Sequence, residues 1–166
     1  HLYAFPDSAS GTLRFAGVLT ELAQVERQRG IDDAAIVAML ERAQRLYEHR
    51  TKDVQRDPRS RASAIVNAHV LTLLRAKAHD PDGLAAAARR LAALAPDAAP
   101  RQAHAAWCLL NAAAWFAERG DDAAAGRCDD DAMAALLACD AAGWFPPIHL
   151  DDAPCQRLRE RAEFAR

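Results

Sequence analysis

Alanine constrains the fold of this chain more than any other residue, because it makes up roughly a quarter of the 166 residues. Alanine is the best helix former, since its side chain loses no entropy when a helix forms. No segment alternates Val, Ile, Thr and aromatic residues with the period of two that a strand requires. The sequence therefore predicts an all-α fold.

Six amphipathic helices are predicted from apolar residues at helical spacing and from residues that start or stop helices. They are expected to start near residues 12, 33, 59, 81, 98 and 121. The fifth is apolar on nearly every side, which predicts the most buried helix. The first is expected to end at Arg29 and to pack through one apolar stripe, formed by Phe15, Val18, Leu19, Leu22 and Val25.

Several residues predict where helices begin and end. Ser8 and Ser10 are candidate caps of the first helix. Asp80 can cap the fourth helix, and Pro81 suits its first position because the missing N–H would be unpaired there. We expect the end of the second helix to fray into the polar stretch 52–59, where Pro58 blocks its continuation, and Ser60 to open the third helix. Gly126 allows a break in the sixth helix.

The loops between the six helices are short, so helices that are neighbours in sequence are expected to pack antiparallel. This predicts one helical domain over 1–166, with helix pairs at 1–56, 57–96 and 97–143 and a C-terminal cap at 144–166. A repeat of about 40 residues is typical of an α-solenoid. Periodicity alone leaves a solenoid and a closed six-helix bundle both open.

Charge and hydropathy argue against two classes of partner. The net charge is −2 and the pI about 6.3, whereas nucleic-acid binding needs a basic surface. The longest uncharged run, 103–116, is too short and too polar to span a bilayer. We therefore expect a soluble protein with no membrane insertion, and a cytoplasmic location is favoured. The cysteines are expected to be reduced. Because the chain begins at His1 rather than Met, we expect a fragment or a processed product.

The residues show no arrangement typical of catalysis or metal binding. Cys-x-x-Cys, His-Glu-x-x-His and Glu-x-x-His patterns are missing, as are a nucleophile elbow and a Gly-rich phosphate loop. The spacing of Cys128, Cys139, His149 and Cys155 matches no zinc finger. The acidic run 129–131 is interpreted as negative charge near a helix start, where the helix dipole favours it, rather than as a cation site. We predict no catalytic residues, no metal and no cofactor.

The C-terminal third contains the run Trp107, Cys108, Leu109, Leu110 and Asn111, which has an aromatic residue, leucine and then a small residue. This run is similar to the first helix of a tetratricopeptide repeat. Ala132, Leu136 and Cys139 resemble the small–large–small seam of its second helix. Residues 149–164 are similar to the segment that closes many bacterial tetratricopeptide arrays, and Leu150, Leu158 and Phe164 could cover the last repeat. The resemblance implies a tetratricopeptide-like α-solenoid of about six main helices and a short C-terminal capping helix.

In such a stack the first helices of the pairs line a concave surface that can hold a peptide or a partner helix. The candidate binding residues, expected to face this groove, are Asn67, Arg75, Arg101, His104 and Trp115. We therefore expect a non-catalytic protein–protein interaction or scaffolding module that binds a peptide or a partner protein. The alternative is a regulatory or accessory helical domain of a larger bacterial enzyme or signalling protein, packed against an adjoining domain of the same polypeptide.

Overall fold

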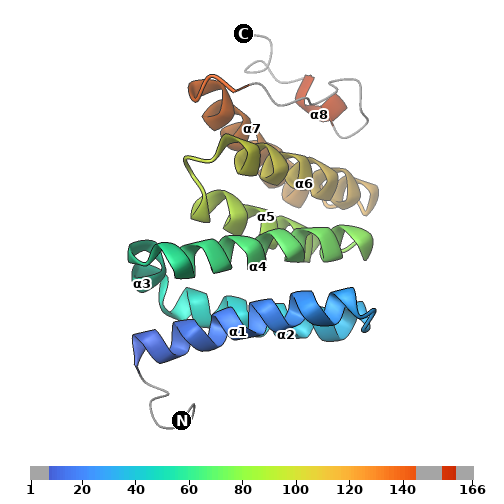
Figure 1. Ribbon diagram of the computed structural model, residues 1–166. Helices are drawn as coiled ribbons and strands as arrows, with labels where there is room; N and C mark the ends of the chain where they lie inside the picture. Colours follow the sequence, from blue (N-terminus) through green and yellow to red (C-terminus); the bar gives the residue numbers. More distant parts are fainter. Residues whose placement is uncertain (1–7, 145–154, 160–166) are drawn as a thin grey trace. The chain divides into compact units, whose positions relative to one another are not determined.

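Helices account for nearly all of the regular structure in this computed structural model, which describes residues 8–144 and 155–159 (Figure 1). The all-α prediction is confirmed, since these described residues contain no strand. The chain divides into two compact units, His1–Leu74 and Arg75–Arg166. The described helices are α1 (Ala9–Gln28), α2 (Asp33–His49), α3 (Thr51–Arg56), α4 (Pro58–Lys77), α5 (Pro81–Leu94), α6 (Ala99–Glu118), α7 (Asp122–Ala141) and α8 (Gln156–Arg159).

Side-chain caps begin α1, α5 and α7. The Ser8 hydroxyl accepts a hydrogen bond from the backbone N–H of Gly11 at 3.0 Å, and the Asp80 carboxylate accepts one from Gly83 at 3.0 Å. The Asp121 carboxylate accepts a hydrogen bond from the backbone N–H of Ala124 at 2.9 Å. Each bond satisfies a donor of the first helical turn that has no partner inside the helix. The caps predicted at Ser8 and Asp80 are confirmed.

The predicted frayed stretch 52–59 is wrong, because it contains most of α3 and the start of α4. Pro58 is the first residue of α4, and the preceding helix α3 ends at Arg56, so no helix continues through Pro58 from its N-terminal side. The Asp57 carboxylate accepts hydrogen bonds from the backbone N–H groups of Ser60 at 3.1 Å and Arg59 at 3.3 Å. Ser60 therefore lies inside the helix and Asp57 caps it. The break allowed at Gly126 does not occur either, since α7 continues through that residue.

In the first unit, α1 and α2 pack side by side (Figure 1). The buried residues of α2 are Ile36, Leu40, Ala43 and Tyr47. On α1 the predicted stripe is largely wrong. Its buried residues are Thr12, Leu13, Ala16, Leu19, Thr20 and Ala23, whereas Val18, Leu22 and Val25 are 53%, 42% and 43% exposed. Thus α1 packs through small side chains together with Leu13 and Leu19, and it leaves Val18, Leu22 and Val25 exposed.

A buried polar network joins α1, α2 and α4. The Asn67 amide donates to the backbone carbonyl of Leu40 at 3.0 Å and lies 3.4 Å from the Thr20 hydroxyl. The same hydroxyl lies 3.4 Å from the phenol oxygen of Tyr47. Buried polar groups must be paired, so these bonds fix how the three helices meet.

This network predicts an alkaline loss of stability. Burial raises the pKa of Tyr47 above its usual 10.0, with the Glu21 charge adding to the rise and hydrogen bonds with Thr20 and Ser63 opposing it. Because the folded state holds the phenol proton more tightly, the stabilisation is complete below pH 10.0 and falls as pH rises through the folded-state pKa. At about pH 8, Tyr47→Phe should be less stable than wild type by about 0.5–1.5 kcal/mol. Denaturant unfolding up to about pH 11 should show this difference closing, and a constant difference would contradict the assignment.

In the second unit, α6 packs against both α5 and α7. Eleven of its residues are buried, more than in any other described helix, which confirms the prediction for the most apolar helix. The hydrophobic core around α6 also contains residues of α5 and α7, and it includes Cys108 and Cys128. All four cysteines are buried thiols, and burial raises the pKa of Cys128 and Cys139.

The short helix α8 is held against α7. Leu158 is buried in the same core as α6, and the Arg157 guanidinium donates to the buried Asp129 carboxylate at 3.0 Å. Asp131 pairs with Arg89 at 2.6 Å. The interpretation of the acidic run as a helix start is therefore wrong, because these residues lie well inside α7 and two of them form ion pairs. Leu150 and Phe164, the other residues expected in the cap, lie outside the described residues.

Candidate functional site

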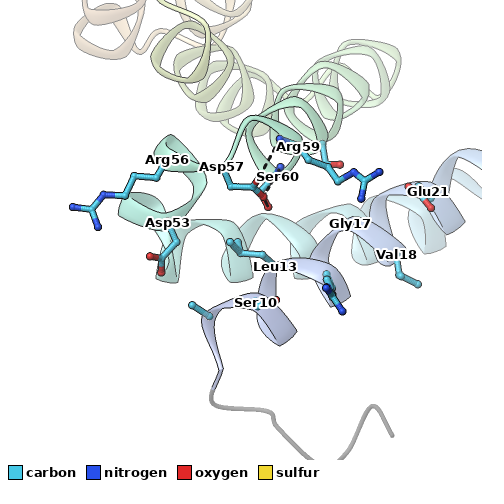
Figure 2. Close-up of a pocket in the computed structure, with 13 residues that line it drawn as sticks. Ser10, Leu13, Gly17, Val18, Glu21, Asp53, Arg56, Asp57, Arg59 and Ser60 are labelled. Atoms are coloured by element: carbon cyan, nitrogen blue, oxygen red, sulfur yellow. Dashed lines mark hydrogen bonds between the residues drawn. The ribbon is translucent and has the colours of Figure 1, made fainter.

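A pocket of about 920 Å³ opens in the first unit between the start of α1, the end of α3 and the start of α4 (Figure 2). Its base is formed by the buried residues Leu13 and Ser60. Several of the residues that line the pocket are alanine, glycine or serine, whose small side chains leave this space unfilled. The complete lining is Ala9, Ser10, Leu13, Arg14, Gly17, Val18, Glu21, Asp53, Arg56, Asp57, Arg59, Ser60 and Ser63.

The junction of α3 and α4 forms one wall of the pocket and is held by Asp57. Besides the two backbone N–H groups that it caps, its carboxylate accepts a hydrogen bond from the Ser60 hydroxyl. These bonds, chiefly the one from the hydroxyl, lower the pKa of Asp57. Asp57 therefore stays ionised at neutral pH and is engaged in starting α4.

The charges of the lining balance. Its arginines are Arg14, Arg56 and Arg59, and its carboxylates are Glu21, Asp53 and Asp57. Figure 2 shows Arg56 extending away from the pocket, whereas Asp57 and Ser60 face each other inside it. The lining contains no histidine, cysteine or lysine, and the Ser60 hydroxyl is bonded to the Asp57 cap. The groups present can form ion pairs and hydrogen bonds with a ligand and can pack against apolar side chains.

An exposed apolar row continues from the pocket along α1. We call Val18, Leu22 and Val25, together with their neighbours Arg14 and Glu21, the outer face of α1. The three apolar residues have the i, i+4, i+7 spacing of one helix side, opposite to the buried Ala16 and Ala23. Val18, Arg14 and Glu21 also line the pocket, so the outer face and the pocket form one continuous surface.

Asn67, the only predicted groove residue in the first unit, does not lie on this surface. It is 1% exposed, and its amide is bonded to Leu40 and Thr20. Its expected orientation, away from the packed side of its helix, is therefore wrong. The physical reason is that the contacting faces of α1 and α2 place polar atoms in the core, which a buried amide can satisfy.

The other predicted binding residues lie at two places in the second unit. Arg75 forms an ion pair with Asp80 at 2.7 Å, and the Trp115 ring lies against the ring of His79 with centroids 4.9 Å apart. Both therefore flank the turn between α4 and α5. Arg101 and His104 lie toward the other end of α6, where the His104 Nε2 is 3.6 Å from the Cys108 sulfur. The helical rise separates Arg101 from Trp115 by about 20 Å, so the four residues do not form one compact site.

The six predicted helices do not form this pocket, because they include neither α3 nor the start of α4. A signal for both was present. Asp57-Pro58 repeats the order of residues at Asp80-Pro81, where a capping aspartate and a proline at the first position were read as a helix start. Because 52–59 is rich in charged residues, this stretch was predicted to be frayed polar chain rather than a helix.

No protein-family model, no curated protein and no solved structure matches this chain. None of the described helices is both long enough and apolar enough to cross a membrane. Within the described residues, no three His, Cys, Asp or Glu side chains gather in a way that could hold a metal ion.

Proposed function

We propose that this chain is a protein–protein interaction module, and that a partner polypeptide docks on the outer face of α1 and in the adjoining pocket. One observation carries the proposal. Three aliphatic residues of α1, Val18, Leu22 and Val25, recur at helical spacing, as they would to cover a core, but they are 42–53% exposed while Leu13, Leu19 and small residues pack inside. A regular apolar row that no described residue of its own chain covers is typical of a surface that covers something in another chain.

The pocket supports the same function. An apolar row along a helix offers area for a partner, but binding energy concentrates where a side chain is fully surrounded. The pocket beside Val18 has an apolar base at Leu13 and charged residues around its rim. This arrangement suits an interface with a desolvated centre and a polar border.

The proposal includes the architecture that the tetratricopeptide resemblance implies, namely antiparallel helix pairs in a solenoid with α8 as its cap. Buried Leu158 and the ion pair between Arg157 and Asp129 support the cap, because they place α8 against the last long helix. Helical repeats of this kind act through extended surfaces rather than through deep catalytic clefts. The docking surface proposed here differs from the groove expected from the sequence, because it lies on α1, α3 and α4.

The function can be tested by selecting ligands without assuming their identity. A library of displayed helical peptides is selected on the wild-type chain, and the binding of the selected peptides is then measured by fluorescence anisotropy. Val18→Asp and Leu22→Asp should weaken binding at least about tenfold, because a charge placed in an apolar contact must lose its water.

Leu137→Asp is the matched control, since Leu137 is 56% exposed on α7 and lies in the other unit. It should leave binding unchanged. If the selected peptides bind Leu22→Asp as tightly as wild type, or if Leu137→Asp weakens them equally, the docking surface is not the outer face of α1.

A further inference from the structure

The charge balance of the pocket bears on what the partner is. Three arginines and three carboxylates line it, so the formal charges cancel. In a two-fold symmetric dimer the same patch meets itself, and a patch of one sign would repel its copy. A balanced patch with both signs on one helix is what self-association requires, whereas a strongly acidic or basic partner would favour a patch of the opposite sign.

The order of residues along α1 is also complementary to itself. Arg14 and Glu21 lie at equal distances on either side of the midpoint between Gly17 and Val18. Ser10, at the pocket, and Val25, at the far end of the apolar row, are likewise equidistant from it. Turning the helix end for end about this midpoint therefore places the positive charge on the negative one and the apolar row on the pocket.

We propose that the partner is a second copy of this chain, bound with the two α1 helices antiparallel and the two-fold axis between Gly17 and Val18. Arg14 pairs with Glu21 of the partner subunit, and the reciprocal pair forms on the other side of the axis. Val25 packs at the pocket end that Ser10 of the partner subunit borders. This inference rests on the proposed function, because it names the occupant of the same docking surface.

The side chains needed for this contact are available. Arg14 and Glu21 are both exposed, and neither forms an ion pair with another described residue. They are seven positions apart, about two helical turns, which is too far for a pair within α1. Gly17 at the axis has no side chain, so the two backbones can approach closely there.

A dimer contact of this kind must extend beyond the apolar row. A specific dimer buries about 800 Å² on each subunit, which three half-exposed aliphatic side chains do not supply. The full contact adds the length of α1, about 30 Å, and the pocket walls on α3 and α4. The apolar row and the pocket act together in this contact, which is the reason for assigning both to one interface.

A charge-swap experiment tests the dimer. Sedimentation equilibrium of the full chain should show a reversible monomer–dimer equilibrium. Arg14→Glu or Glu21→Arg alone should weaken the dimer at least about tenfold, because each places like charges together twice. The double variant, Arg14→Glu with Glu21→Arg, should restore it, because both pairs re-form with reversed signs. Glu118→Arg, an exposed charge reversal on α6, is the control and should change nothing.

A covalent test checks the geometry. Val18→Cys should form a disulfide between subunits under mild oxidation, since residue 18 lies next to the axis, whereas Leu137→Cys should not. A chain that stays monomeric at every concentration, or a double variant that fails to restore the dimer, would overturn the inference. If the chain is monomeric yet selected peptides still require Leu22, only the identity of the partner is wrong and the proposed function stands.

Discussion

Leu19→Asp is expected to unfold the first unit, whereas Leu22→Asp, three residues further along the same helix, is expected to leave its stability nearly unchanged. Leu19 is 8% exposed and faces the core, so its replacement removes a packed side chain and buries a charge. Together these effects cost at least about 3 kcal/mol. Leu22 is 42% exposed, and substitutions at exposed positions usually change stability by less than about 0.5 kcal/mol.

Urea unfolding followed by circular dichroism measures both free energies of unfolding. Leu19→Ala and Leu22→Ala provide milder versions, in case Leu19→Asp cannot be purified. Comparable losses at the two positions would mean that Leu22 also packs inside the first unit, and the outer face would then not be a surface.

Leu110→Ala should produce the second large loss, in the other unit. Leu110 is fully buried on α6, the helix that packs against both α5 and α7. Removing a leucine side chain from such a site costs about 2–5 kcal/mol, depending on how far the surroundings collapse into the cavity.

Leu137→Ala removes the same atoms from an exposed position on α7. Its expected cost is less than about 0.5 kcal/mol. Thermal unfolding monitored by the tryptophans Trp107 and Trp115, which pack against the same core, would follow the transition. A loss for Leu110→Ala as small as that for Leu137→Ala would contradict the central position of α6.

The positions of the long helices could be predicted because the signals for them are local. Ser8 and Asp80 cap helices in the structure as their sequence neighbours indicate, since a cap bonds to an N–H three residues away. The burial of α6 was also predictable, because a helix that is apolar on every side has no side suited to water.

The packing of α1 could not be predicted, because its sequence offers two faces that a core could accept. One carries Val18, Leu22 and Val25, and periodicity alone favours it. The other carries small residues such as Ala16, and it is the face that packs. The choice depends on Asn67, which lies 47 residues after Thr20 and is buried within hydrogen-bonding distance of it. Local periodicity contains no information about such a contact.

The candidate site was missed for a related reason. Its walls come from α1, α3 and α4, and the pocket exists only once these helices meet. The ion pair between Asp129 and Arg157, separated by 28 residues, was likewise not predictable from the spacing of either residue. By contrast, the five predicted groove residues were assigned from the tetratricopeptide resemblance. One of them is buried in the first unit, and the other four occupy separate places in the second.

The central claim is that a polypeptide covers the outer face of α1, and methyl NMR tests it most directly. With labelled Val and Leu methyl groups, spectra are recorded while the chain is concentrated and, separately, while a selected peptide is added. The account predicts shifts of the Val18, Leu22 and Val25 signals and no change at Leu137. Shifts that appear at Leu137 or elsewhere, while the signals of the outer face stay constant, would contradict it.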